Sequence, residues 1–247
     1  MKKKIDFPFP IENGGDVLRN TQDNSLDFYE IVFQNEQHIR TAKQINFKLQ
    51  EIFDTMKLSV YKGCITEGVL PGGLKVKRRA RALCSKLLEE HQYKTIDAWE
   101  EALRKTPLVF DTLNTWISCF ALAVNEQNAA MGKIVISPTN VAAGVIPAAL
   151  LYHQYFAKNK GFEDVKKFLL VAREIGCIFK KGAMISAADG GCQAEIGVSS
   201  VMAAGGLIAC MGGSTEQILM AAKIAMEHHL GLTCDPIHSL VQVPCIE

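Results

Sequence analysis

Apolar residues recur at helical spacing along most of this chain. Between Asp27 and Met56 they fall three and four positions apart, which places them on one face of a helix. The residues of that face are Ile45, Leu49, Ile52, Phe53 and Met56. Asp27, followed three positions later by Glu30, resembles an acidic capping box, which signals a helix start. The pattern therefore predicts one helix that begins at Asp27 and continues towards Met56.

The same periodicity predicts further helices. A Gly-rich turn over residues 69–79 leads into a second helix, whose apolar stripe comprises Ala80, Leu83, Cys84, Leu87 and Leu88. More helices are expected over residues 96–103, 110–128 and 163–179. Another helix is expected after Ser214, because Ser214 and Gln217 form a capping box, and Gly231 is expected to end it.

Strand signals are few. The run KIVIS, residues 133–137, is the only convincing series of β-branched residues, and Pro138 follows it. The sequence therefore predicts an all-α fold, a single multi-helix domain over residues 1–247 with at most one short strand. The Gly-rich loops between the helices carry the polar residues that are candidates for chemistry.

Composition limits the class of protein. With 247 residues, 48% of them hydrophobic and 21% charged, the chain can bury a single large core. Its net charge of +1 gives no electrostatic reason to expect nucleic acid or an anionic membrane as a partner. No apolar run follows the N-terminal lysines, and the longest apolar run, residues 141–152, is shorter than the roughly 20 residues that span a bilayer. We therefore expect a cytoplasmic protein.

Eight cysteines in a reducing compartment favour metal binding or redox chemistry over a disulfide framework. Five lie among apolar neighbours in helical contexts, where packing is expected: Cys64, Cys84, Cys119, Cys177 and Cys210. The other three are predicted in loops. Cys192 follows two glycines, and Cys234 and Cys245 lie near prolines. Widely spaced cysteines with a nearby proline are a familiar feature of iron–sulfur ligands.

Spacing alone leaves alternatives open for these three cysteines. They contain no Cys-x-x-Cys pair, which is unusual for a structural zinc site. Zinc binding nevertheless remains an interpretation, because His228, His229 and His238 lie close in sequence to Cys234. His228 and His229 are better explained as a pair at the C-terminal end of a helix, where positive charge is favourable. Three unrelated loop cysteines are the remaining interpretation.

Five motifs in order carry a resemblance to one family. They are VLPGGLKVKRRA, FALAVNEQNAA, SPTNVAAGVIPA, GCQAEIGVSSVMAAGG and AMEHHLGLTCDPIHSLVQVPCIE. From about Phe7 to its last residue, the chain is similar to the α chain, or α domain, of iron–sulfur-dependent bacterial L-serine dehydratases. The resemblance implies conversion of L-serine to pyruvate and ammonia without pyridoxal phosphate.

The resemblance also implies a cofactor. A 4Fe-4S cluster would be held by Cys192, Cys234 and Cys245, with one iron left open as a Lewis acid for the substrate β-hydroxyl. A base would then remove the Cα proton, water would leave, and the resulting enamine would hydrolyse.

Substrate-binding residues are implied for the loop that reads SPTN. In the family this loop lies near the substrate, which assigns Thr139 and Asn140 to substrate binding. Ser137 and the backbone of Gly144 are weaker candidates. Hydroxyl and amide groups can donate to a substrate carboxylate, although Pro, Thr and Asn are also ordinary turn residues.

A partner is implied as well. Family members carry a β-type domain with a Ser-rich, His-containing motif that approaches the cluster, and this sequence has no such motif. We therefore expect a β-type domain or subunit as partner, in a homo- or hetero-oligomer. The catalytic base is expected on that partner, and no residue of this chain is assigned to the role.

The chain departs from the family pattern in two ways. Family members read CIERN at the third cysteine and continue through several helices, so the end at Glu247 suggests a truncated chain. Larger residues replace glycines or small residues of the family at Met131, Val141, Ala194, His238 and Ser239, and Asp189 replaces a glutamate. These changes leave a related β-hydroxy or β-thio amino acid open as the substrate.

A function of another class is a non-catalytic helical module that binds zinc or thiols. It predicts a colourless protein with one zinc, whereas the lyase predicts a brown protein with about four irons per chain. A pyridoxal-phosphate lyase is less well supported, because no lysine paired with a Gly-rich phosphate loop is recognisable.

Overall fold

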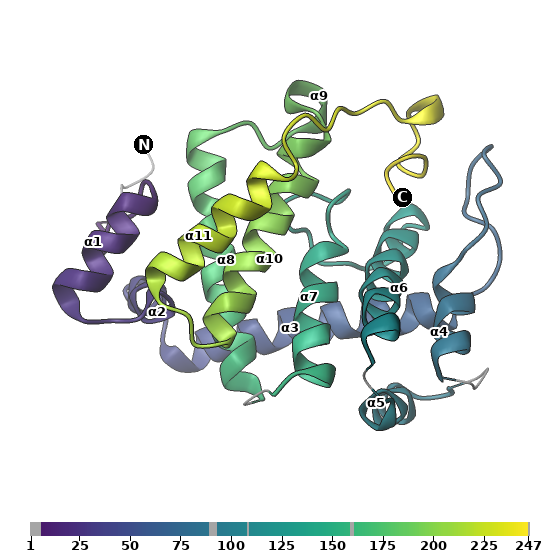
Figure 1. The fold of residues 1–247 in the computed structure, drawn as a ribbon, viewed down its shortest axis with the longest axis horizontal. Coiled ribbons are helices and arrows are strands. Elements are labelled where there is room, and N and C mark those ends of the chain that lie inside the picture. Colours follow the sequence, from purple (N-terminus) through teal and green to yellow (C-terminus); the bar gives the residue numbers. More distant parts are fainter. Residues whose placement is uncertain (1–5, 89–92, 108, 159–160, 247) are drawn as a thin grey trace.

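The computed structural model describes residues 6–88, 93–107, 109–158 and 161–246, which form an assembly of helices (Figure 1). The all-α prediction is confirmed, and none of these residues forms a named strand. The α-helices are α1 (Gly14–Asn24), α2 (Phe28–Gln37), α3 (Ala42–Ile65), α4 (Ala80–Leu88), α5 (Ile96–Lys105), α6 (Phe110–Ala129), α7 (Val145–Phe156), α8 (Phe162–Gly182), α9 (Ala187–Gly190), α10 (Ile196–Cys210) and α11 (Thr215–Glu227). Two short 3-10 helices are η1 (Cys192–Ala194) and η2 (Ile237–Ser239).

Helix α3 is the element against which most of the others pack. It runs across one side of the assembly in Figure 1 and contacts α2, α4, α5, α6, α7 and α8. A reciprocal pair caps its first turn: the Gln44 N–H donates to Thr41 Oγ1 at 3.3 Å, and the Thr41 N–H donates to Gln44 Oε1 at 2.9 Å. These bonds satisfy backbone groups that a helix start leaves open.

The predicted continuous helix from Asp27 towards Met56 is wrong, because two helices occupy that span. A helix does begin after Asp27, whose N–H donates to Glu30 Oε2 at 2.8 Å, but that helix, α2, ends at Gln37. The chain turns and restarts after Thr41 as α3. Apolar spacing continues across the break, so periodicity did not reveal it. The capping box at Thr41 is the local signal that does.

The other predicted helices are confirmed, with ends that differ by a few residues, as α4, α5, α6, α8 and α11. Ser214 caps α11 as expected, since it accepts from the Gln217 N–H at 3.3 Å. The helix ends at Glu227, however, and Gly231 lies in the following turn with φ of +94°. Residues 133–137 form no strand, because no described segment pairs with their backbone.

Helices α1, α7, α9 and α10 were not predicted, and α10 shows one reason. Its sequence, IGVSSVMAAGGLIAC, is apolar on nearly every face, so no amphipathic stripe marks it. The stretch Cys192–Cys210 is even long and apolar enough to resemble a membrane span, with mean hydropathy 1.3. Because 61% of that stretch is buried against other helices of this chain, it has the environment of a core helix.

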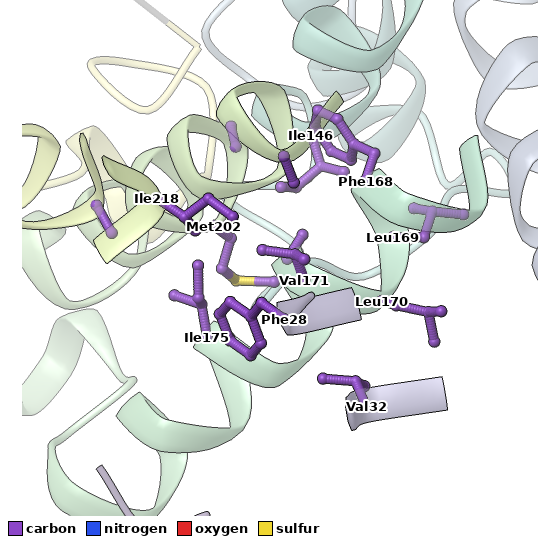
Figure 2. Packing of buried hydrophobic residues seen from close by; sticks show 14 of the residues in the cluster. Phe28, Val32, Ile146, Phe168, Leu169, Leu170, Val171, Ile175, Met202 and Ile218 are labelled. Atoms are coloured by element: carbon purple, nitrogen blue, oxygen red, sulfur yellow. The ribbon is translucent and has the colours of Figure 1, made fainter. Parts of the chain in front are cut away.

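Helix α10 lies in the larger of two apolar clusters, between α7, α8 and α11. Figure 2 shows Phe28 from α2, Ile175 from α8 and Met202 from α10 within this cluster. Glycines allow α10 to approach α8 closely: a Cβ on Gly206 would lie 3.0 Å from the Phe168 ring. The close approach positions the first turn of α10, which carries polar groups described below.

The smaller cluster is rich in aromatic side chains. Trp99 from α5 packs edge-on against Phe120 from α6, with ring centroids 6.2 Å apart. Phe120 also stacks on Phe156 from α7 at 6.3 Å. These contacts join α5, α6 and α7, and Tyr61 from α3 packs against Trp99 with ring centroids 5.7 Å apart. Helices α3 and α6 approach closely at Gly63, where an added Cβ would lie 2.3 Å from the Ala123 carbonyl oxygen.

Gly63→Ala should lower the free energy of unfolding by about 1–3 kcal/mol, because the methyl group would force α3 and α6 apart. Chemical denaturation of this variant and of Gly182→Ala would measure the difference. Gly182 has open space around its Cβ direction. Equal stability of the two variants would contradict the close packing of α3 on α6.

Candidate functional site

The loop between α6 and α7 carries the predicted substrate residues and is tied to α10 by a buried serine. Ser199 is 0% exposed, and its hydroxyl oxygen lies 2.8 Å from the Ser137 carbonyl oxygen and 3.1 Å from that of Ala142. The Ser199 hydroxyl donates to these acceptors, because a carbonyl oxygen can only accept. Ser199 therefore fixes the loop over residues 137–142 against the first turn of α10.

The end of α6 holds the same loop from the other side. Asn128 Nδ2 donates to the Asn140 carbonyl oxygen at 3.1 Å. A Cβ on Gly144 would lie 2.6 Å from the Ala121 carbonyl oxygen and 2.9 Å from Asn125 Oδ1. Gly144 thus has a packing role, since it lets the start of α7 approach α6. Of the predicted substrate residues, Ser137 is buried, Thr139 is half-buried and Asn140 is exposed.

Several buried polar atoms in this region lack a hydrogen-bond partner among the described residues. They include Thr139 Oγ1, Asn125 Oδ1, Glu126 Oε2 and Glu195 Oε2. Glu195 is only 8% exposed and lies one turn before Ser199. Buried polar atoms are nearly always hydrogen-bonded, so such groups point to a ligand that supplies the missing partner. Glu195 was not singled out from the sequence, although it stands in the quoted motif GCQAEIG.

Cys192 lies three residues before Glu195, at the start of η1, in a turn that is paired with the segment after α11. The Gln193 N–H donates to the Leu232 carbonyl oxygen at 3.2 Å, and the Gly231 N–H donates to Gln193 Oε1 at 2.9 Å. Gly191 has φ of +75°, and a Cβ there would lie 2.6 Å from the Leu232 carbonyl oxygen. Glycine is therefore needed before Cys192 for both conformation and close approach.

The structure brings the three predicted cluster ligands into one neighbourhood. Burial, a hydrogen bond with Cys234, and the negative charges of Cys234, Cys245 and Glu195 raise the pKa of Cys192 to about 11. Burial, followed by the negative charge of Cys234, raises the pKa of Cys245. Positive charge from a metal would reverse these effects, because it stabilises thiolates.

The segment that carries Cys245 is held by contacts to the Gly-rich turn after α3. Gln242 Nε2 donates to the Pro71 carbonyl oxygen at 2.6 Å, and Ile246 is only 5% exposed. In Figure 1 this last segment passes from the end of α11 over the helices towards the loop between α3 and α4. Cys245 is thereby anchored on both sides, by Gln242 and Ile246.

Two of the three histidines of the zinc interpretation have other partners. His228 Nδ1 donates to the Ile224 carbonyl oxygen at 2.8 Å, and His229 Nδ1 donates to that of Ala225 at 2.6 Å. His229 Nε2 then accepts from the Ser200 hydroxyl at 3.1 Å. His228 caps the C-terminal end of α11. His238 is exposed in the loop between Cys234 and Cys245.

A second set of three neighbouring cysteines was not predicted from the sequence. Cys64, Cys84 and Cys119 are buried, as expected, but their sulfur atoms also lie within 4.8 Å of one another. Hydrogen bonds with Cys119 and then Cys64 lower the pKa of Cys84 to about 4. The positions are 20 and 35 residues apart and show no ligand motif. Their only sequence signal is that each falls on an apolar helix face.

The two sets of three cysteines differ in the spacing of their sulfur atoms, which decides what kind of metal centre each can bind. In a four-iron cluster each thiolate binds a different iron, so the sulfurs stand farther apart than three sulfurs around one ion. Cys192, at the start of η1, and Cys234 and Cys245, in the segment after α11, are partly exposed, and their sulfur atoms do not all lie within 4.8 Å of one another. That spacing is too wide for three ligands of one ion. The tighter group fits at most a single ion.

A groove with a volume of about 620 Å³ borders the same loop at Ser137 and Pro138. It is lined by residues of α3 and α8, both apolar, such as Leu49 and Leu169, and charged, such as Lys48 and Arg173. None of Thr139, Asn140, Cys192, Cys234 or Cys245 lines it. Size alone would select this groove, but the thiols and unpartnered polar atoms lie elsewhere, and we place the candidate site with them.

Comparison with known proteins identifies the family of this chain. Residues 23–247 match the family model described as serine dehydratase alpha chain. A protein of Haemophilus influenzae named L-serine dehydratase is 41% identical over 246 residues, which is 100% of this chain and 51% of the relative. One of Streptomyces coelicolor with the same name is 44% identical over 239 residues, 97% of this chain and 49% of the relative. L-serine dehydratase 2 of Escherichia coli is 40% identical over 243 residues, which is 98% of this chain and 50% of the relative. The chain thus spans about half the length of these relatives.

The turn between Cys234 and Cys245 is strained in this sequence. His238 and Ser239 have φ of +52° and +56°, a conformation that favours glycine, and the Leu240 N–H closes the turn onto the Ile237 carbonyl oxygen at 3.1 Å. His238→Gly should therefore raise the free energy of unfolding by about 1 kcal/mol. Thermal and denaturant unfolding would measure the change.

His228→Gly is the matched control, because His228 has φ of −75° at a helix end. Glycine there should leave stability unchanged or lower it. If both replacements have the same effect, the account of strain at His238 is wrong.

Proposed function

This chain belongs to the serine dehydratase alpha-chain family, and from that premise we propose that it is the cluster-binding part of an iron–sulfur-dependent L-serine ammonia-lyase, which converts L-serine to pyruvate and ammonia. One observation carries the proposal beyond family membership. The loop over residues 137–142 and the turn that bears Cys192 and Glu195 are joined through the buried Ser199 hydroxyl. A substrate held by the loop would therefore lie beside the cysteines.

In this proposal, Cys192, Cys234 and Cys245 hold a 4Fe-4S cluster. The cluster supplies, when bound, a Lewis acid for the substrate β-hydroxyl. Three cysteine ligands leave one iron without a protein thiolate, and Gly191 lets the backbone before Cys192 pack closely on Leu232 in the segment that leads to Cys234. The partial exposure of the three thiols is consistent with access for a small amino acid.

The unpartnered polar atoms match the groups of an α-amino acid. Thr139 Oγ1 can donate to the substrate carboxylate, and the amide of the exposed Asn140 can add a second hydrogen bond. Glu195 Oε2 can accept from the substrate ammonium group. A buried carboxylate beside three thiolates has a strong electrostatic need for a cation, and the ammonium group provides it. Ser137 and Gly144 position the loop through their backbones.

The remaining parts of the proposal concern partners and location. The relatives are about twice as long as this chain, which supports a β-type domain or subunit that completes the active site and supplies the base. The assembly would be a homo- or hetero-oligomer that acts on L-serine in the cytoplasm, where all eight cysteines can remain the free thiols seen here. A related β-hydroxy or β-thio amino acid would use the same Thr139 and Glu195 contacts.

Anaerobic reconstitution with iron and sulfide tests the cluster. The chain should become brown and hold about four irons, and Cys192→Ala, Cys234→Ala and Cys245→Ala should each lose most of the colour. Visible absorption with iron and sulfide analysis gives the result. Cys210→Ala is the control, because Cys210 donates to the Asp164 carbonyl oxygen in another part of the structure and should keep the cluster. A brown product in all three single variants would contradict the ligand assignment.

Glu195→Gln should weaken L-serine binding to the cluster-loaded chain by about tenfold or more, since a neutral amide cannot balance the substrate ammonium charge. Titration calorimetry measures the affinity, and the visible spectrum verifies that the cluster is intact. Asp189→Asn removes one negative charge at an exposed position nearby and should bind L-serine as the unchanged chain does. Equal binding by both variants would remove Glu195 from the substrate site.

A further inference from the structure

A second set of three cysteines lies in the aromatic core and is built from elements other than the loops described above. Cys64 from α3, Cys84 from α4 and Cys119 from α6 are 3%, 3% and 0% exposed, and their sulfur atoms lie within 4.8 Å of one another. We propose that this thiol triad binds one divalent thiophilic cation of the zinc class, at a site separate from the proposed cluster. The proposal is independent of the lyase function.

The spacing of the sulfurs matches ligands of a single ion. Cys64 Sγ and Cys119 Sγ are 3.9 Å apart. With zinc–sulfur bonds of about 2.3 Å, two sulfurs of a tetrahedral site stand about 3.8 Å apart. Cys84 Sγ is already within 4.8 Å of both, so binding requires only small side-chain movements. A four-iron cluster would need a wider triangle, which the core does not offer.

The frame around the triad is rigid. Gly63, beside Cys64, holds α3 so close to α6 that an added Cβ would lie 2.3 Å from the Ala123 carbonyl oxygen. Cys119 Sγ donates to the Ala80 carbonyl oxygen at 3.4 Å, which links α6 to the first turn of α4. The Ala80 carbonyl oxygen lies beside the thiols and can serve as a fourth metal ligand. The three helices therefore hold the ligands in place before a cation arrives.

Charge favours a divalent cation. In the complex all three sulfurs are thiolates, and any thiol protons still present are released to solvent on binding. Three thiolates with a divalent cation carry a net charge of −1. Arg81 on α4 supplies positive charge that acts on Cys84, and its Nη1 donates to the Ile65 carbonyl oxygen at 3.0 Å, next to Cys64. Arg81 also pairs with Glu67 at 2.8 Å, but Glu67 is exposed and screened by water. A monovalent cation would leave two buried negative charges.

The test uses the chain with Cys192, Cys234 and Cys245 all replaced by alanine, so that the loop thiols cannot bind metal. Zinc alone is titrated without oxygen against a chromogenic chelator. The expected result is one zinc per chain with a Kd of about 1 μM or tighter, and a higher Tm in the presence of zinc.

Further replacements in that variant identify the ligands. Cys84→Ala should abolish the stoichiometric zinc and the rise in Tm, and Cys210→Ala, which lies outside the triad, should retain both. Circular dichroism verifies folding of each protein, and Cys119→Ala replaces Cys84→Ala if the latter does not fold. Two results would overturn the proposal: no stoichiometric zinc in the starting variant, which leaves the triad as packed thiols only, or stoichiometric zinc retained by a folded Cys84→Ala or Cys119→Ala variant.

Discussion

The hydroxyl of Ser199 is the contact on which the arrangement of this site depends. It is fully buried and lies within hydrogen-bond distance of the carbonyl oxygens of Ser137 and Ala142. One small side chain thus fixes an irregular loop to the first turn of α10, with no strand to hold that loop. A buried carbonyl oxygen without a donor costs about 1–3 kcal/mol, so the loop has a strong preference for this position. Asn128 completes the attachment from α6.

That constraint brings two kinds of chemistry together. Cys192 and Glu195 belong to the turn that leads into α10, and Thr139 belongs to the loop that Ser199 holds. The segment with Cys234 is joined to Cys192 by backbone pairing of Gln193 with Leu232. The thiols and the unpartnered oxygens of Thr139 and Glu195 therefore come from three parts of the chain: the loop over residues 137–142, the turn over residues 192–195 and the segment after α11. The tight packing of α10 on α8 and α11 gives these stretches a common support.

Some parts of this structure could be predicted from local sequence signals, and others could not. Capping boxes identified the starts of α2 and α11, because they act within four residues. The break between α2 and α3 was missed because the apolar period continues across it. Helix α10 was missed because it is apolar on all sides. The ligand residues Cys192, Cys234 and Cys245 were proposed from family motifs, and their closeness depends on tertiary contacts. Glu195 and the thiol triad were missed because burial, a lack of hydrogen-bond partners and closeness in space are properties of the folded chain.

The most direct test of the account is the position of iron in the folded protein. Anomalous diffraction at the iron edge, from crystals of the anaerobically reconstituted chain soaked with L-serine, would locate it. The account predicts one iron cluster bounded by Cys192, Cys234 and Cys245, with L-serine between an open iron, Thr139 and Glu195. Iron bound instead at Cys64, Cys84 and Cys119, or L-serine remote from the loop over residues 137–142, would contradict it.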